Sequence, residues 1–283
     1  MGSVDLHMHS TASDGDCAPA EVVRRAAAAG LTTIGLTDHD SLAGLPEAEL
    51  QGSEAGVEVV AGCEFSVAAP WGEMHLLAYF LPDDDERLNS FLQDQRLKRR
   101  RRAERIVERL NKAGAVITVE QVLRASSGEA IGRPHVARAL VDGGVVPDVD
   151  AAFRRYLGWR RPAFVPKELP PVAEVTELVR SVGGVTSAAH LRDRATRRIL
   201  RQLRGAGVDG VEVMHPAHDQ ATVQRVERLA SELDMLPTGG TDWHGEAVAS
   251  PERAPLGSIT IPQEWLERLR ARHLERTKLS EAK

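Results

Sequence analysis

The chain has 283 residues, and its 42% hydrophobic and 27% charged residues are typical of a globular protein with a substantial core. Its net charge of -5 excludes a general attraction to nucleic acid or to anionic membranes, so any contact with nucleic acid must be local. Two cysteines cannot build a disulfide scaffold, and no apolar run approaches the roughly 18 residues needed to cross a bilayer. We therefore expect a cytoplasmic protein with no membrane partner.

Short apolar runs of strand length alternate with helical patterns along most of the chain. The expected strands cover residues 4–8, 33–37, 57–62, 75–81, 185–189, 208–214 and 236–240. The helical pattern between the first two strands has Pro19 in its first turn and Gly30 at its end. This alternation predicts an α/β fold of repeated β/α units with parallel strands.

The alternation is interrupted between residues 83 and 165, where the pattern is helical and no strand is expected. A long helix is predicted over 88–113, and Pro166 ends regular structure at the close of the segment. We therefore expect two domains. One is formed by residues 1–82 and 166–283, and the other is an inserted helical domain of residues 83–165.

Metal-binding residue types recur at the ends of the expected strands. His7 and His9 lie on the same face of the first strand, because side chains alternate along a strand. Packing would explain a single His-x-His pair equally well. The other strand ends add Asp38, His39, Asp40, Glu64, His75, His190, Asp242 and His244. Because α/β barrels carry their sites at the carboxyl ends of strands, this recurrence predicts a multinuclear site for Zn, Mn or Fe.

Six motifs, in this order, resemble those of the polymerase and histidinol phosphatase (PHP) superfamily. They are Asp5-x-His7-x-His9-Ser10, Ser13-Asp14-Gly15, Thr37-Asp38-His39-Asp40, Glu64-Phe65-Ser66, Ala189-His190 and Gly239-Gly240-Thr241-Asp242-Trp243-His244. The inserted segment, with Arg99, Arg102 and the run from Gly132 to Arg138, is similar to that of a stand-alone bacterial subgroup. This subgroup includes nucleoside 3′,5′-bisphosphate phosphatases and RNase AM, a 5′-to-3′ exonuclease on short RNA.

The resemblance implies a distorted (β/α)7 barrel with an inserted helical cap, holding two to three divalent metal ions. By position, the first ion would be held by His7, His9, Glu64 and Asp242, the second by Glu64, His75 and His190, and the third by Asp14, His39 and His244. Glu64 would bridge the first two ions. Leu191 stands where the family commonly has Pro, and Thr241 replaces a common Ser, but neither change removes a ligand.

Residues beside these motifs receive roles in catalysis or positioning. Asp38 is expected to accept the ring N–H of His39 or to orient a neighbouring ligand, whereas Asp40 fits a helix cap better. His218 resembles a family residue close to the metals and is a candidate for substrate contact or proton transfer. His215 receives no role.

The basic run between Arg96 and Arg105 divides into two faces at helical spacing. Arg99 and Arg102 continue the apolar side of the helix, whereas a solvated face explains the other basic residues. An arginine on an inward face needs an anion. We therefore expect Arg99 and Arg102 to bind phosphate, with a structural ion pair as the alternative.

The motif Arg133-Pro134-His135 begins a predicted helix. His135 would lie at the positive end of this helix, where either a phosphate contact or packing would explain it. We expect Arg133 and His135 to contribute to substrate binding.

Divalent ions gathered in one small volume suit a phosphate ester, which carries negative charge. We expect a metal-dependent phosphatase in which a metal-bridging hydroxide hydrolyses phosphomonoesters of nucleoside 3′,5′-bisphosphates or related nucleotides. The alternatives are a 5′-to-3′ exonuclease on short single-stranded RNA, a sugar or histidinol phosphatase, and a non-catalytic structural PHP module. Hydrolysis of a carbon–nitrogen bond is less well supported, because the lysine expected of such barrels is missing from the motifs.

Overall fold

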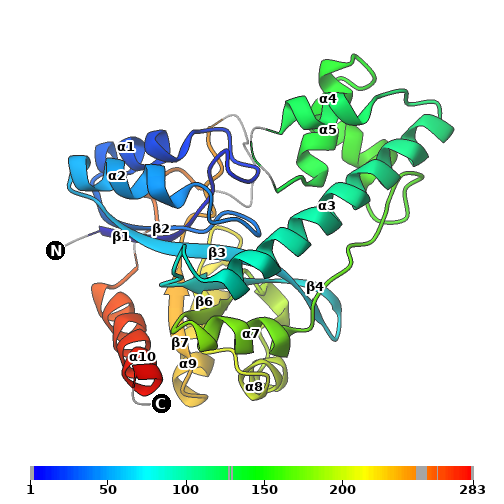
Figure 1. The fold of residues 1–283 in the computed structure, drawn as a ribbon. Helices are drawn as coiled ribbons and strands as arrows, with labels where there is room; N and C mark the ends of the chain where they lie inside the picture. Colours follow the sequence, from blue (N-terminus) through cyan, green and yellow to red (C-terminus); the bar gives the residue numbers. More distant parts are fainter. Residues whose placement is uncertain (1–2, 127, 129, 247–253, 260, 282–283) are drawn as a thin grey trace.

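Figure 1 shows the fold as a computed structural model, which describes residues 3–126, 128, 130–246, 254–259 and 261–281. The described strands form one seven-stranded sheet in chain order: β1 (Ser3–Met8), β2 (Leu31–Leu36), β3 (Glu58–Ala69), β4 (Gly72–Tyr79), β5 (Val185–Ala188), β6 (Gly210–Met214) and β7 (Leu236–Gly239). Each of the expected strands is present. After β7, Trp243 pairs with Met8 at the end of β1, so the chain beyond the last strand lies beside the first.

Strand β4 runs antiparallel to both of its neighbours, whereas the other pairs of strands are parallel. The prediction of parallel strands is therefore wrong for β4. Only Pro70 and Trp71 connect β3 to β4, and so short a connection can only reverse the chain. The reversal places His75, near the start of β4, opposite Ser66, near the end of β3.

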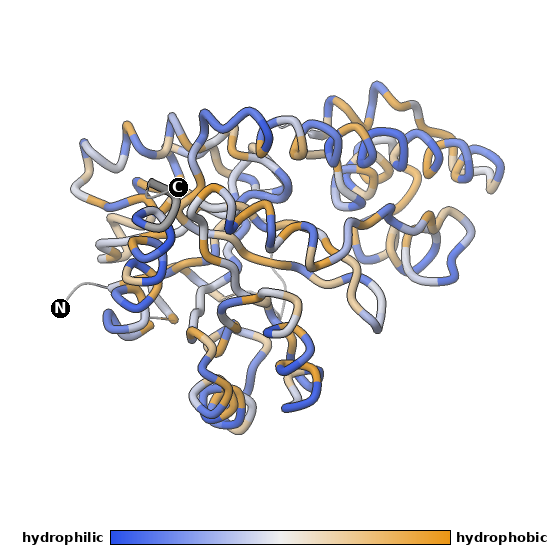
Figure 2. The backbone as a smooth tube through the Cα atoms, turned by 60° about the horizontal axis from the view of Figure 1, so that its bottom comes forward, coloured by the Kyte–Doolittle hydropathy of each residue, from blue (hydrophilic) through white to orange (hydrophobic). Residues whose placement is uncertain are grey.

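Helices flank this sheet and cover its apolar side chains. They are α1 (Pro19–Ala28), α2 (Leu45–Ala55), α7 (Val172–Ser181), α8 (Arg197–Gly205), α9 (Gln220–Glu232) and α10 (Gln263–Glu281). In α1, Val22, Val23 and Ala26 are buried at helical spacing, which explains its packing on the sheet. Figure 2 shows hydrophobic residues gathered along the strands and hydrophilic residues alternating with them on the helices. None of the helices in the described ranges is long and apolar enough to span a membrane.

The segment between β4 and α7 is helical. It contains α3 (Glu86–Lys112), α4 (Val119–Ala125), α5 (Arg133–Asp142), α6 (Val149–Ala152) and the π-helical turn η1 (Phe153–Leu157), most of which lie to one side of the sheet in Figure 1. Leu88 and Leu92, at the start of α3, pack in the core of the sheet. Ile106 and Leu110, near its end, belong to a separate apolar cluster with α5. The long helix α3 therefore connects two cores.

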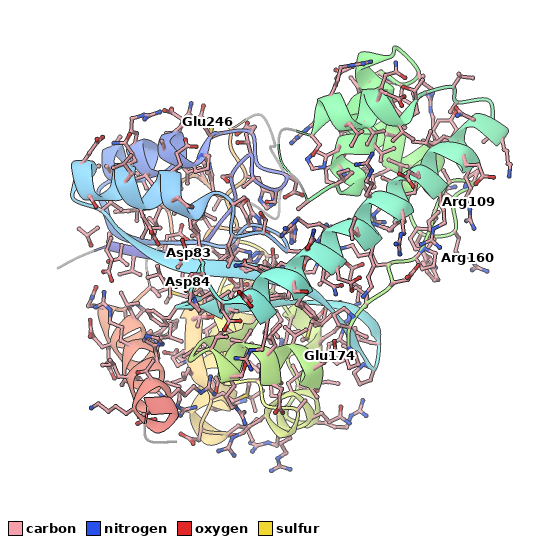
Figure 3. All side chains as sticks on the ribbon, in the orientation of Figure 1. Asp83, Asp84, Arg109, Arg160, Glu174 and Glu246 are labelled. Carbon is pink, nitrogen blue, oxygen red and sulfur yellow. The ribbon has the colours of Figure 1, made fainter. Side chains whose placement is uncertain are left out.

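The chain returns to the sheet alongside α3. Arg109 lies near the far end of α3 (Figure 3) and donates to the carbonyl of Phe164, and Arg102 donates to the carbonyl of Val165 at 2.8 Å. These bonds hold the returning segment, which includes Phe164 and Val165, against α3. The part of the chain that leaves the sheet region and the part that returns to it therefore lie side by side.

Candidate metal centre

The histidines and carboxylates expected from the strand ends converge at one edge of the sheet. Parallel strands bring their carboxyl ends together, which accounts for the residues in or after β1, β2, β3, β5 and β7. His75 lies near the amino end of β4 instead. It reaches the same edge because β4 is antiparallel, and the N–H of Ala189 after β5 donates to its carbonyl.

Glu64 lies at the centre of this cluster and is only 1% exposed. Its Oε2 faces His7, His9 and His39 and its Oε1 faces His75 and His190, at nitrogen–oxygen distances between 2.9 and 3.4 Å. The two carboxylate oxygens therefore address two different sets of imidazoles. This is the geometry that a bridging ligand requires.

Among the residues that the structure describes, three groups bring their donor atoms within 4.8 Å of one another, close enough to share a cation. They are His7, His9, Glu64 and Asp242; His39, Glu64 and His75; and His9, Asp14, His39 and His244. The first group is the set expected for the first ion. The second contains His39 with Glu64 and His75 but not the expected His190, whose Nε2 lies 3.1 Å from Glu64 Oε1. The third group also takes in His9.

Several polar atoms of this cluster are buried without a hydrogen-bond partner. They include His7 Nε2, His9 Nε2 and Asp14 Oδ1. Such atoms are rare in folded proteins, because leaving them unpaired costs free energy. Each belongs to a group that is close enough to hold a cation, and imidazoles with carboxylates suit Zn, Mn or Fe. The residues therefore fit a multinuclear metal centre.

Opposite charges in the cluster offset each other in this buried environment. Burial lowers the pKa of His9 and His75, but the neighbouring carboxylates, Glu64 among them, raise it to about 9 in both. Burial favours protonation of Glu64, but the imidazoles of His75 and His39 hold the pKa of Glu64 well below its usual range. Glu64 is therefore ionised at neutral pH, and a cation would take the place of protons on His9 and His75.

Glu212, which sequence analysis missed, holds two of these histidines in place from β6. The Nδ1–H of His7 donates to its Oε1 at 2.9 Å, and the backbone N–H of His190 donates to its Oε2 at 2.7 Å. A carboxylate behind an imidazole fixes which ring nitrogen carries the proton and leaves the other free to bind a cation. The sequence signal is a glutamate inside a buried apolar strand.

Glu73 plays the same part for His75 and was likewise not assigned from the sequence. Its carboxylate accepts from Nε2 of His75 at 3.1 Å and pairs with Lys167, whose Nζ also donates to Ser66 at 2.9 Å. Burial and the nearby Arg99 lower the pKa of Lys167 to about 8. The Nδ1 atom of His75, which faces Glu64, is thereby left as the donor atom for a cation.

Asp38 holds the loop after β1 rather than the ring of His39. Its carboxylate accepts from the backbone and hydroxyl of Ser10 at 2.8 and 2.6 Å and from the hydroxyl of Ser13 at 2.5 Å. This loop carries Asp14, so Asp38 orients a ligand of the third group through the backbone. These contacts support the second of the two roles expected for Asp38, the orientation of a neighbouring ligand, which stays a prediction.

His218 does not offer a ring nitrogen to the centre. Its Nδ1–H donates to the carbonyl of Val213 at 2.9 Å, and its Nε2 accepts from the backbone N–H of Arg192 at 3.1 Å. Both ring nitrogens of His218 therefore bond to the backbone, and its expected role in substrate contact or proton transfer stays a prediction. His215 is the residue that faces the centre, with Nε2 3.5 Å from Asp242 Oδ2.

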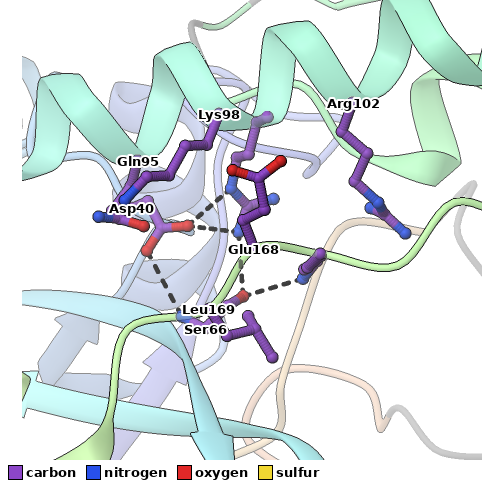
Figure 4. A pocket seen from close by; sticks show the side chains of 9 residues that line it. Asp40, Ser66, Gln95, Lys98, Arg102, Glu168 and Leu169 are labelled. Carbon is purple, nitrogen blue, oxygen red and sulfur yellow. Dashed lines mark hydrogen bonds and ion pairs between the residues drawn. The ribbon is translucent and has the colours of Figure 1, made fainter.

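Arg99 is buried against the carboxylate of Asp40, which Figure 4 labels beside α3 together with Ser66. Its Nε donates to Asp40 at 2.6 Å, and its Nη2 donates to Ser66 at 3.2 Å. The ion pair that was kept as the alternative is therefore present, and Asp40 is its partner rather than a helix cap. The Nε of Arg102 donates a hydrogen bond to the carbonyl of Val165. The cavity beside these residues has a volume of only about 20 Å³.

His135 connects the helical segment to the metal centre. Its Nδ1 accepts from the backbone N–H of Gly132 at 2.9 Å, and its ring also contacts the backbone of Ser13. Burial lowers the pKa of His135 to about 4, so the ring is neutral at pH 7. From the same helix, Arg138 donates to the carbonyl of Asp14 at 3.0 Å. Helix α5 thus rests directly on the loop that carries Asp14.

Arg133 lines an open cavity beside the centre. This cavity has a volume of about 270 Å³, and its lining includes His75, His190, Arg133 and Arg194. The guanidinium of Arg133 lies over the rings of Phe153 and Phe164 and donates to the carbonyl of Leu157 at 3.4 Å, and no carboxylate within the described ranges forms an ion pair with it. Of the basic residues expected to bind substrate, Arg133 is therefore the one with an uncompensated charge next to candidate metal ligands.

Comparisons with known proteins agree with this geometry. The model of the PHP domain matches residues 5–157. A 5′-3′ exoribonuclease from Haemophilus influenzae is 35% identical to this chain, covering 85% of it and 89% of the relative. A 3′,5′-nucleoside bisphosphate phosphatase from Chromobacterium violaceum is 30% identical, covering 86% of this chain and 88% of the relative.

Solved structures show the same architecture. A Bifidobacterium adolescentis protein described as a metal-dependent phosphoesterase superposes with a TM-score of 0.85 at 31% identity, covering 96% of each chain. The expected α/β class is confirmed by this match. Together with the clustered imidazoles and carboxylates, these likenesses show that the chain belongs to the PHP-domain family of phosphoesterases.

Proposed function

We propose that this phosphoesterase removes a phosphate group from nucleoside 3′,5′-bisphosphates at a centre of two to three divalent ions, with Mn, Zn or Fe as the metal. The observation that carries the proposal is the placement of Glu64, whose two oxygens face two sets of imidazoles. The proposed ligand sets are His7, His9, Glu64 and Asp242; Glu64, His75 and His190; and Asp14, His39 and His244. The named bisphosphate phosphatase among the relatives supports the choice of substrate.

The ions, when bound, supply an activated water at neutral pH and offset the negative charge of the phosphate. The chain's own residues hold the donor atoms ready. Glu212 and Glu73 each keep a proton on the outer nitrogen of an imidazole, so that the inner nitrogen of His7 and of His75 faces the centre.

Arg133 is proposed to hold the phosphate that does not react. Its guanidinium is not paired with a carboxylate among the described residues, and it lines the same cavity as His75 and His190. A guanidinium binds phosphate in two parallel hydrogen bonds, which suits this role. Arg99 is proposed instead to support the site by fixing Asp40 and Ser66.

The overall architecture is proposed to be a distorted (β/α)7 barrel with a helical cap of residues 83–165. The contact of Trp243 with Met8 supports closure between the first and last strands. The separate apolar cluster of the helical segment, and its contacts with Ser13 and Asp14 through α5, support a cap that adjoins the centre.

A phosphate-release assay with added Mn(II) tests the proposal. The substrates are nucleoside 3′,5′-bisphosphates, nucleoside monophosphates, a sugar phosphate and 5′-phosphorylated di- to tetranucleotides. We expect bisphosphates to react with a higher kcat/KM than monophosphates, and elemental analysis to find two to three ions per chain. Less than one ion per chain, together with no activity on any substrate after adding Mn(II), would refute the proposal.

A further inference from the structure

A second hollow adjoins the metal-side cavity and is lined by aromatic and basic residues. This groove has a volume of about 880 Å³, and its lining includes Trp71, Trp159, Phe164, Arg133, Arg194 and Lys167. Aromatic residues make up only 4% of the chain, so three of them in one groove are a local concentration. Trp159 is 74% exposed, so its ring is accessible to a ligand in the groove.

The groove is continuous with the cavity beside the centre. Trp71, Glu73, Arg133 and Arg194 line both hollows. A substrate whose phosphate lies near His75 and His190 can therefore extend into the groove without leaving the surface. The groove comes from the β3–β4 turn, the start of α5, the segment after η1 and the 3-10 helix η2 (Arg192–Arg194) after β5.

The charge and shape of the groove fit a nucleotide. Lys167 neutralises Glu73, while Arg133 and Arg194 form no ion pair with a carboxylate in the ranges that the structure describes, so the groove is positive overall. The rings of Trp159 and Phe164 are 5.0 Å apart and nearly perpendicular, and the guanidinium of Arg133 lies 5.9 Å from the ring of Phe164. Aromatic faces with arginines at their edges are how proteins bind single-stranded nucleic acid without reading its sequence.

We propose that this groove is a stacking subsite for the nucleotide beyond the scissile phosphate of a single-stranded oligonucleotide. Trp71 and Trp159 provide the faces for its base, and Arg194 contacts its phosphate. The inference rests on the proposed phosphoesterase function for orientation, since it places the reacting phosphate at the metal centre. It adds the residues that would hold the second nucleotide of such a substrate.

Direct binding tests the subsite independently of turnover. The probe is a fluorescent 5′-phosphorylated trinucleotide with phosphorothioate linkages, measured by anisotropy with the Mn-loaded full chain. Trp159→Ala should weaken binding by about ten- to a hundredfold, the range seen when a stacked base loses its aromatic partner. Trp159→Phe, which keeps a ring, should stay within a fewfold of the wild type. Arg194→Ala should reduce the salt dependence of log Kd by roughly 0.7, as expected for one lost phosphate contact.

Turnover provides the matched comparison. Trp159→Ala should raise KM for the unmodified trinucleotide and leave kcat/KM for a nucleoside 3′,5′-bisphosphate within about twofold. Leu50→Ala, an equally exposed apolar change on α2, should affect neither substrate. Unchanged trinucleotide binding in Trp159→Ala, or an equal loss for both substrates, would overturn the subsite. A wild type that binds the trinucleotide through Trp159 but hydrolyses nothing would refute the proposed function and leave the subsite standing.

Discussion

Glu64→Gln is the substitution that tests the metal centre most directly. It preserves the shape of the side chain but removes the negative charge and replaces one oxygen with an NH2 group. Both oxygens of Glu64 face imidazole nitrogens at 2.9 to 3.4 Å, so the NH2 group must point into one of the two ligand sets. An N–H group cannot bind a cation. We therefore expect the variant to retain at most one ion per chain, held by the Asp14 group, which does not include Glu64.

The size of the effect follows from linkage between metal binding and folding. A cation present at about 100 times its Kd stabilises the folded chain by about 2.7 kcal/mol. For a protein of this size each kcal/mol raises Tm by roughly 2 to 4 °C, so Mn(II) should raise the Tm of the wild type by roughly 5 to 10 °C. Glu64→Gln should lose most of this increase and nearly all turnover.

Thermal unfolding with and without Mn(II), together with elemental analysis, measures both quantities. Glu58→Gln is the matched control, because Glu58 lies on the same strand, is exposed and pairs with Arg270 away from the centre. It should bind metal and respond to Mn(II) like the wild type. If Glu64→Gln kept two ions and the full Tm increase, the bridging role of Glu64 would be wrong.

Four further predictions concern the residues around the centre. Glu73→Gln removes the carboxylate behind His75 and should weaken binding of one ion by about ten- to a hundredfold in a Mn(II) titration, while a second ion binds normally. Burial lowers the pKa of His135 from 6.5 to about 4. Between these two pH values the unfolded chain binds a proton at His135 and the folded chain does not, so the free energy of unfolding should decrease by up to about 3 kcal/mol as the pH falls. His135→Gln keeps an acceptor for the helix cap and should show a smaller decrease in urea unfolding between pH 7 and 4.5; an equal decrease in both proteins would contradict this. Arg133→Ala should raise KM for a bisphosphate about ten- to a hundredfold with little change in kcat. Arg99→Ala should lower Tm by at least about 5 °C, because the carboxylate of Asp40 is left buried without its partner. A pure KM effect of Arg99→Ala, with unchanged Tm, would restore its expected role as a phosphate ligand.

The clustering of the proposed ligands could be predicted from the sequence because it depends on chain order and strand ends. Residues that follow parallel strands meet at one edge whatever the details of packing, so His7, Glu64 and Asp242 could be placed together without coordinates. The carboxylates that hold these histidines in place, such as Glu212, could not be predicted in this way. Glu212 on β6 contacts His7 on β1 and His190 after β5 because of the way these strands are placed relative to one another. This placement leaves no local pattern in the sequence.

The inward position of Arg99 on α3 was not enough to identify the anion that pairs with it. Helical spacing correctly places Arg99 on the inward face of α3, and an inward arginine does need an anion. The spacing cannot say which anion. Asp40 follows β2 and lies far from Arg99 in the sequence, so their ion pair depends on how α3 crosses the sheet. Charge without a partner, as at Arg133, is the better sign of a substrate contact, and it is visible only in the structure.

The antiparallel β3–β4 hairpin accounts for more of the site than any other local feature. In an all-parallel sheet, a crossover helix would separate these strands, and His75, at the start of its strand, would lie at the edge opposite Glu64. The tight turn instead brings His75 to within 2.9 Å of Glu64 and sets Glu73 behind it. The same turn carries Trp71 out to the groove. Two chain-neighbouring strands therefore supply the proposed bridging ligand, an imidazole that faces it and one wall of the proposed stacking subsite. Lengthening this turn should for this reason disturb metal binding and oligonucleotide binding together.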